Sequence, residues 1–186
     1  MAYLYEKYTK EAVPQMMKKF GYRNIMEVPR LKKVVINCGF GRMISGKTKE
    51  EQRKIQEAVA RDLTQLCGQR AVITKARNSI AGFKIREGQN IGAKATLRRA
   101  KMYDFLERTI TAGLPRSRDF QGISRRGVDE GGNLTFGIRE HISFPEISPE
   151  KINFIFSFEM TAVTSARSKD EGEALFELLG FPLQKA

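Results

Sequence analysis

The 186-residue sequence contains one histidine, two cysteines and no long apolar run. A single histidine, His141, cannot form a His-based metal cluster or a histidine-paired catalytic dyad unless another chain supplies the partners. Ordinary placement predicts that it is a half-exposed histidine on a strand. Cys38 and Cys67 are too far apart for a metal knuckle and too few for a disulfide framework, so we expect buried free thiols. No run reaches the roughly 18 apolar residues of a membrane span, so we expect a cytosolic protein without a membrane partner.

Acidic residues are scarce in the middle of the chain. Residues 70–101 contain nine Lys or Arg and only one acid, Glu87, which is a local net charge of +8 in a chain of net charge +12. Residues 1–69 carry +7, whereas residues 102–186 carry −3. Basic and apolar side chains alternate in the central segment, so it can form strands with one buried face. A folded basic surface indicates a polyanion partner.

The structural elements that carry the basic residues indicate which type of nucleic acid binds. No recognition helix or zinc finger is recognisable, which disfavours duplex DNA. Strands and loops that present Arg, Asn and Thr suit irregular RNA backbones and splayed bases. The pattern therefore predicts RNA binding, and the acidic C-terminal third should face elsewhere. A basic chaperone that binds unrelated RNAs equally well is an alternative.

Helices and strands are predicted from periodicity and from capping residues. Pro14 suits the first turn of a second helical piece within the first helix. Thr48 and Glu51 predict a capping box. The predicted helices are 3–20, 49–66, 101–112 and 170–179, and the predicted strands are 31–39, 72–75, 83–86, 91–98, 134–138 and a long, central 152–164.

This grouping of strands with hairpin-like gaps, and of helices between the groups, predicts an α+β fold. We expect a mainly antiparallel sheet of about five strands with helices packed on one face. The chain is long enough for one well-buried domain and short for two, so residues 1–186 are expected to form a single domain.

One string competes with the RNA interpretation. Residues 41–48, Gly-Arg-Met-Ile-Ser-Gly-Lys-Thr, satisfy the phosphate-loop pattern and lie between a predicted strand and a predicted helix. In a nucleotidase, Lys47 would reach the terminal phosphates and Thr48 would bind magnesium, together with an Asp that ends a second strand. The only comparable run, 154–159, ends in Glu159, and the sheet looks antiparallel where that fold needs parallel strands. We therefore expect a flexible connection and a helix cap.

Several strings resemble the bacterial large-subunit ribosomal protein five family. The clearest is Thr-Lys-Ala-Arg-Asn-Ser-Ile-Ala-Gly-Phe-Lys-Ile-Arg-Glu-Gly at 74–88, followed by Ile-Gly-Ala-Lys-Ala-Thr-Leu-Arg at 91–98. Residues 31–41, 114–122, 133–138 and 144–147 resemble the family's first strand, a loop, a later strand and a turn, in the same order. The resemblance covers nearly the whole chain, although residues 41–48 are not part of the family pattern.

The resemblance implies a structural protein without catalytic residues, metal or cofactor. It implies binding to 5S rRNA, which the protein helps to attach in the central protuberance of the large subunit. The positions that match the family's 5S-contacting residues are Lys33, Asn37, Gln65, Thr96 and Arg98. Their side chains can neutralise phosphates or form hydrogen bonds with sugars and base edges.

The resemblance also implies contact with the peptidyl-site tRNA through a basic loop that contains glycine. This loop comprises Lys75, Arg77, Asn78, Ser79, Ile80, Ala81, Gly82, Phe83 and Lys84. Further implied partners are the 23S rRNA of the central protuberance, other 5S-binding ribosomal proteins and protein thirteen of the small subunit, which would form an intersubunit bridge. The implied location is the large subunit of cytoplasmic ribosomes.

Overall fold

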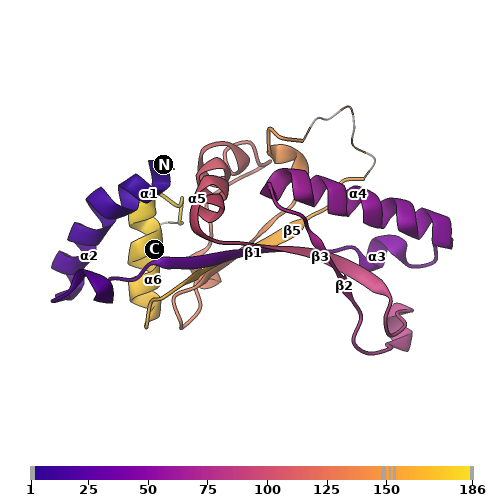
Figure 1. Ribbon diagram of the computed structural model, residues 1–186, viewed down its shortest axis with the longest axis horizontal. Helices are drawn as coiled ribbons and strands as arrows, with labels where there is room; N and C mark the ends of the chain where they lie inside the picture. Colours follow the sequence, from indigo (N-terminus) through magenta and orange to yellow (C-terminus); the bar gives the residue numbers. More distant parts are fainter. Residues whose placement is uncertain (1–2, 148–149, 151, 153, 185–186) are drawn as a thin grey trace. The chain divides into compact units, whose positions relative to one another are not determined.

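A computed structural model describes residues 3–147, 150, 152 and 154–184 (Figure 1). The helices are α1 (Tyr3–Lys7), α2 (Val13–Phe20), α3 (Gly41–Ile44), α4 (Lys49–Cys67), α5 (Arg99–Arg108) and α6 (Lys169–Leu179). The strands are β1 (Leu31–Gly39), β2 (Val72–Lys75), β3 (Asn90–Leu97), β4 (Leu134–Ile138) and β5 (Phe158–Thr164). Short 3-10 or π turns are η1 (Tyr8–Ala12), η2 (Ile25–Glu27), η3 (Ala81–Phe83), η4 (Thr109–Gly113), η5 (Arg125–Gly127) and η6 (His141–Ser143).

The strands form one five-stranded sheet in the order β2-β3-β1-β5-β4. The α+β class, with a mainly antiparallel sheet of about five strands, is confirmed. The chain also divides into two compact units: unit 1 comprises Met1–Val35, Leu97–Phe136 and Met160–Ala186, and unit 2 comprises Ile36–Thr96 and Gly137–Glu159. That residues 1–186 form a single domain stays a prediction.

Helix α4 of unit 2 follows its sequence signals closely. The Thr48 hydroxyl accepts a hydrogen bond from the Glu51 amide, and the Glu51 carboxylate accepts one from the Thr48 amide, which is the predicted capping box. Ile55, Val59 and Leu63 are at most 1% exposed and form the predicted apolar stripe. Each contributes about 1.5 to 3 kcal/mol through burial. The helix contacts β2 and ends at Gly68, which has a φ of +62°.

Strands β1 and β3 alternate between a buried and an accessible face. In β1, Ile36 and Cys38 are buried, whereas Asn37 between them is exposed. In β3, Ala93 and Ala95 are buried and Lys94 is exposed. This period of two is the pattern of a sheet with one face in the core and one open to a partner.

In unit 1, the N-terminal helical segment contains a proline, and the helical segment is not broken there. Pro14 lies at the start of α2, as predicted, where a missing N–H costs little. The preceding turn η1 is a π turn, closed by a hydrogen bond from the Val13 amide to the Tyr8 carbonyl. The wider turn absorbs the irregularity at Pro14, and α2 then ends at Gly21 with a φ of +70°.

The later helices of unit 1 keep their predicted positions with shifted ends. The helix predicted over 101–112 starts earlier, at Arg99, and continues after Arg108 as the π turn η4. In α6, the Ser168 hydroxyl caps the amide of Glu171. A Cβ on Gly172 would lie 2.5 Å from the Gly132 Cα, so these two glycines allow α6 to pack directly on a loop backbone.

Three sequence-based expectations need correction. Residues 83–86 form no strand, because they belong to the end of η3 and the turn after it, where Lys84 has a φ of +52°. The last strand begins at Phe158 and not at residue 152; residues 154–157 are not strand, and residues 151 and 153 lie outside the described part. That strand is interior but not long. His141 is not on a strand and is fully buried.

Candidate nucleic-acid interface

The antiparallel β2–β3 ribbon of unit 2 carries much of the central basic charge. Val72 pairs with Lys94 and Thr74 with Gly92, so these side chains share one face, and Thr96 follows on it by alternation. A Cβ on Gly92 would lie 2.7 Å from the Thr74 hydroxyl oxygen and 2.9 Å from the Cys38 carbonyl oxygen. Only glycine therefore lets β2, β3 and β1 approach this closely.

The loop between β2 and β3 is held by its own backbone. Ile80 and Ile85 exchange two backbone hydrogen bonds of 3.0 and 3.2 Å. At the base of the loop, the Ala76 amide donates to the Gln89 carbonyl at 2.8 Å, and the Gly88 amide donates to the Ala76 carbonyl at 3.0 Å. Because main-chain groups largely fix the shape of the loop, most of its side chains are left free to contact a partner.

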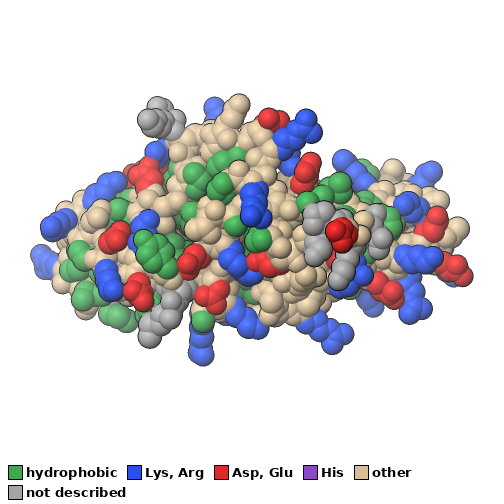
Figure 2. Space-filling model, turned by 90° about the horizontal axis from the view of Figure 1, so that it is seen from above, with side chains coloured by type: hydrophobic (Ala, Val, Ile, Leu, Met, Phe, Trp, Pro, Cys, Tyr) green, Lys and Arg blue, Asp and Glu red, His purple; other side chains and the backbone are tan. Residues whose placement is uncertain are grey.

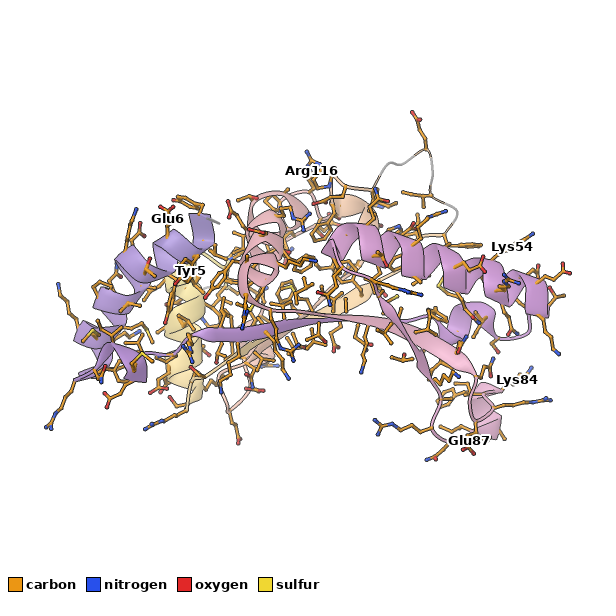
Figure 3. All side chains as sticks on the ribbon, in the orientation of Figure 1. Tyr5, Glu6, Lys54, Lys84, Glu87 and Arg116 are labelled. Carbon is orange, nitrogen blue, oxygen red and sulfur yellow. The ribbon has the colours of Figure 1, made fainter. Side chains whose placement is uncertain are left out.

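The side chains of this loop point outward. Every residue from 77 to 84 is exposed, including the two large apolar side chains Ile80 and Phe83, which are 47% and 63% exposed. Figure 3 shows Lys84 and Glu87 at the tip of the ribbon, on a different part of unit 2 from Lys54 of α4. Exposed Ile and Phe beside cations suit a partner that offers both phosphates and ring or sugar surfaces.

The cations of the ribbon lack acidic partners. Among the described residues, no carboxylate lies within ion-pair distance of Lys75, Arg77, Lys84, Arg86 or Lys94. On α4, in contrast, Arg53 pairs with Glu57 at 2.7 Å. The space-filling view shows Lys or Arg and Asp or Glu side chains interspersed over α4 (Figure 2). The ribbon therefore has a cluster of cations without described carboxylate partners, whereas α4 carries charges of both signs.

All nine residues of the predicted tRNA-contacting loop lie in this ribbon and are exposed: Lys75, Arg77, Asn78, Ser79, Ile80, Ala81, Gly82, Phe83 and Lys84. The Ser79 hydroxyl is engaged, because it accepts a hydrogen bond from the Glu87 amide at 2.9 Å. Ser79 therefore stabilises the loop and is also exposed on its surface. Whether the loop contacts tRNA stays a prediction.

The predicted 5S-contacting residues of unit 2 occupy different elements. Asn37 is exposed on β1, and Thr96 is half-buried on β3. Gln65 is exposed near the end of α4, and its amide donates to the Glu146 carbonyl. Gln69, just after this helix, donates to the Thr96 carbonyl at 3.1 Å, so the end of α4 lies against β3 at Thr96.

The other two predicted residues belong to unit 1. Lys33 is half-buried on β1 and Arg98 is exposed directly after β3. Lys33 is four residues before Asn37 on the same strand, so both side chains belong to the same face of β1. Lys94 and Arg86 were missed by the sequence analysis as site residues. Lys94 could have been found from its spacing, two positions before Thr96 on a strand.

The string at 41–48 is built as a connection and not as a phosphate cradle. Residues 41–44 form the single turn α3, and the Phe40 amide donates to the Ile91 carbonyl at 2.9 Å. The Thr48 hydroxyl is used by the capping box, and the Lys47 ammonium lies 5.7 Å from the centre of the Phe154 ring. The two side chains that would hold phosphate and magnesium are therefore engaged elsewhere.

A buried polar pair in unit 2 is formed by His141 of η6 and Asp62 of α4. The His141 ring stacks on Phe156 with a centroid distance of 4.0 Å, and its Nδ1 accepts a hydrogen bond from the Phe156 amide. Its Nε2 lies 3.8 Å from an Asp62 oxygen, and Asp62 also accepts from the Arg61 guanidinium. Burial lowers the pKa of His141, and the Asp62 charge opposes that shift only in part.

The remaining candidate chemistry is limited. Cys38 and Cys67 are buried free thiols, as predicted, and burial raises the pKa of Cys38 to about 12. In the described part of the chain, His, Cys, Asp and Glu side chains nowhere gather in a group of three that could hold a metal ion. No helix found among those residues has the length and apolarity needed to cross a bilayer.

Comparison with known proteins gives two family matches that together span most of the chain. Residues 24–86 match the family described as Ribosomal protein L5, and residues 90–183 match the family described as the C-terminus of this ribosomal protein. The chain is 50% identical over 184 residues to the large ribosomal subunit protein uL5 of Geotalea daltonii, covering 99% of both chains. It is 48% identical over 185 residues to the uL5 proteins of Desulfotalea psychrophila and Caldanaerobacter subterraneus, covering 100% of each chain.

Proposed function

Because the chain belongs to the L5 family of large-subunit ribosomal proteins, we propose that it binds 5S rRNA and helps to attach it in the central protuberance. Family membership makes the chain a structural constituent of the large subunit of the cytoplasmic ribosome, and not an enzyme. Family membership carries the 5S assignment, and the observation that supports binding to RNA in general is the β2–β3 ribbon, whose described cations have no carboxylate partner. Such cations release counterions when they meet phosphates, which favours binding to RNA.

The residues proposed to contact 5S rRNA are Lys33 and Arg98 of unit 1 and Asn37, Gln65 and Thr96 of unit 2. The exposed Asn37 amide and Arg98 guanidinium support this proposal most directly, because both can reach a partner without rearrangement. Thr96 is half-buried, so its hydroxyl would contact a sugar or base edge that approaches the strand closely. Gln65 would have to share its amide with the Glu146 carbonyl or exchange that bond for one to RNA.

The proposed tRNA contact uses Lys75 and residues 77–84. The charges of Lys75, Arg77 and Lys84 act on phosphates, which are common to every tRNA. Gly82 adds no side chain, and a Cβ there would meet nothing within 4 Å, so the backbone can approach a ribose-phosphate chain. A contact of this kind would bind all tRNAs without reading their sequence.

Three further partners complete the proposal. They are the 23S rRNA of the central protuberance, other 5S-binding ribosomal proteins, and small-subunit protein thirteen across an intersubunit bridge. The acidic C-terminal third of the chain offers charge complementarity to a basic partner protein. No single residue carries the bridge proposal.

The test compares binding of the purified chain to 5S rRNA and to an unrelated RNA of equal length at about 0.15 M salt, where non-specific electrostatic binding is weakened. We expect a strong preference for 5S rRNA. Equal affinities would indicate the generic RNA chaperone instead.

The residues are tested with Asn37→Ala combined with Arg98→Ala. Each lost contact should cost about 1 to 3 kcal/mol of 5S binding. The matched control is Gln52→Ala combined with Arg53→Ala on α4, which also removes one amide and one guanidinium, from a surface of mixed charge. Unchanged 5S affinity in the first variant would show that the proposed residues are wrong.

A further inference from the structure

Unit 1 contains an apolar groove that the proposed RNA contacts do not use. It has a volume of about 990 Å³ and is formed by α1, η1, the η2 turn, the start of β1 and the start of α5. Tyr5, Tyr8 and Tyr103 contribute aromatic rings, and Ile25 and Met26 contribute aliphatic side chains. None of the residues proposed for 5S rRNA or tRNA lines it.

The fold holds the groove in a defined shape. The Tyr8 hydroxyl donates to the Pro29 carbonyl at 3.1 Å, which fixes one ring in the floor. The rings of Tyr5 and Tyr103 meet edge to face with centroids 5.2 Å apart. Tyr8 and Tyr103 are only 9% and 8% exposed, so their rings form the buried floor of the groove.

Two large apolar side chains at the rim of the groove are exposed to solvent. Ile25 and Met26 are 63% and 77% exposed. They belong to η2, whose start is capped by a hydrogen bond from the Met26 amide to the Asn24 side-chain oxygen at 3.0 Å. The Glu27 carboxylate accepts a second bond from the Arg23 amide at 3.1 Å. Because hydrogen bonds fix this turn, the exposure of its apolar residues is a feature of the fold.

The charged residues that line the groove are all basic. Arg30, Lys32 and Arg99 line it, and no acidic residue is among the described residues that do so. Tyr, Met and Arg are the residue types enriched at protein interfaces, and here they supply seven lining positions: Tyr5, Tyr8, Met26, Arg30, Arg99, Met102 and Tyr103. A complementary ligand is therefore apolar and negatively charged.

The accessible surface favours a peptide over RNA as that ligand. RNA bases bind by stacking on open aromatic faces, whereas Tyr8 and Tyr103 are almost covered, and Tyr5, which is 39% exposed, already contacts Tyr103 edge to face. The most exposed large apolar side chains of the groove are those of Ile25 and Met26, which have no ring. Aliphatic rims of this kind receive apolar side chains of a protein segment.

We propose that this groove is a docking site for an acidic, apolar segment of another protein. Apolar anchor side chains of the segment enter between the tyrosine floor and the Ile25–Met26 rim. Its Asp or Glu residues pair with Arg30, Lys32 and Arg99. The proposal is separate from the proposed function, because RNA binding is assigned to other residues.

The test selects ligands from a displayed library of random peptides of about twelve residues, a length typical of peptide-recognition segments, with the full chain as bait. We expect the enriched peptides to combine apolar residues with Asp or Glu. The most enriched peptide is then synthesised with a fluorescent label, and its affinity is measured by anisotropy. Failure to enrich any peptide, or enrichment without acidic residues, would overturn the proposal.

The groove is assigned by variants of exposed residues. Ile25→Ser combined with Met26→Ser should weaken the peptide about tenfold or more, as loss of anchoring contacts does. Arg30→Glu should weaken it as well. The matched control, Val72→Ser combined with Ile155→Ser, removes two apolar side chains of similar exposure from unit 2 and should leave peptide binding unchanged. Equal binding by the groove variant and the wild type would contradict the proposal.

Oligouridine of twelve nucleotides and 5S rRNA serve as the RNA arms of the same experiment. The groove variant should bind both with wild-type affinity. If it loses affinity for either RNA, the groove belongs to the RNA surface and the docking proposal fails, while the proposed 5S function stands. Circular dichroism of each variant confirms that the fold is retained.

Discussion

In the part of the chain that the structure describes, arginine side chains lack carboxylate partners in the β2–β3 ribbon of unit 2 but have them near the end of α6 in unit 1. In the ribbon, Arg77 and Arg86 are exposed and no described carboxylate pairs with them. Near α6, the Arg125 guanidinium donates to Glu173 at 2.9 Å and also to Glu177, and its Nε donates to the Gln184 carbonyl. The same residue type is exposed and without a described carboxylate partner in one region and is a structural tie in the other.

This difference shows that the number of basic residues is a poor guide to polyanion binding. A cation that is already paired must give up its carboxylate before it meets a phosphate, whereas an unpaired cation only loses water and counterions. The distribution of acids therefore decides which part of a basic chain binds RNA. In this chain the ribbon has one acid, Glu87, at its tip, while α6 contains Asp170, Glu171, Glu173 and Glu177.

The largest effect is expected from removing the unpaired cations of the ribbon. The variant with Lys75, Arg77, Lys84 and Arg86 all changed to Ala should lose most of its affinity for total tRNA, measured by filter binding across salt concentrations. The slope of log affinity against log salt should fall by about 3, because each phosphate contact contributes about 0.7 to 0.9.

The control for this variant removes the same charge from paired positions. It changes Lys10, Arg53, Arg125 and Lys169 to Ala, each of which has a carboxylate partner. Its salt slope should stay near the wild-type value. An equal loss of tRNA affinity in both variants would contradict the difference between paired and unpaired cations, because net charge alone would then explain binding.

The next largest effect concerns the close packing that supports the ribbon. Gly92→Ala brings a Cβ against the Thr74 hydroxyl and the Cys38 carbonyl, so the free energy of unfolding should fall by about 1 to 3 kcal/mol. Urea denaturation measures it. Gly137→Ala, on a strand with nothing within 4 Å of the new Cβ, is the control and should be neutral or slightly stabilising. A neutral Gly92→Ala would mean that β1, β2 and β3 separate easily.

A third test concerns the buried His141 in the unit that carries the ribbon. Because the pKa of His141 is lowered in the folded state, the unfolded chain binds its proton first as the pH falls below about 6.5. Stability should therefore be full above that pH and should decrease on acidification, by about 1.4 kcal/mol for each unit of pKa difference. His141→Asn should reduce this dependence. Melting temperatures between pH 7.5 and 5 in wild type and variant measure it, and identical slopes would refute it.

The smallest effect is expected from Arg125→Ala. The variant loses its bonds to Glu173, Glu177 and the Gln184 carbonyl, so its melting temperature should fall slightly. Its affinity for 5S rRNA should not change. A clear loss of RNA binding with an unchanged melting temperature would show that Arg125 is a binding residue and not a structural tie.

Elements with strong local signals were predictable from the sequence. The capping box at Thr48 and Glu51, the stripe on α4 and the glycine after it fixed one helix within a residue of its observed ends. Pro14 was placed correctly because its chemistry allows few positions in a helix. These features depend on neighbours within one or two turns, which the sequence displays directly.

Features that depend on distant contacts were not predictable in the same way. Residues 83–86 look like a strand, but the bonds between Ile80 and Ile85 close a tight loop that prevents a regular ladder. His141 looks like a surface histidine, and only the stacking with Phe156 and the nearness of Asp62 explain its burial. The candidate site was found in sequence through its charge and its family resemblance, but the pairing state of each cation required the structure.

Backbone hydrogen bonds shape the loop between β2 and β3, so its conformation depends little on most of its side chains. Two side chains, Ser79 and Gln89, accept bonds from amides within the loop, and two residues, Lys84 and Gly88, have positive φ angles. Elsewhere the shape depends on main-chain groups that every residue type except proline provides. Positions such as Arg77 and Phe83 can therefore change one at a time without refolding the loop. Such a loop is suited to gradual tuning of affinity by selection, and to use by protein engineers as a fixed frame for new recognition sequences.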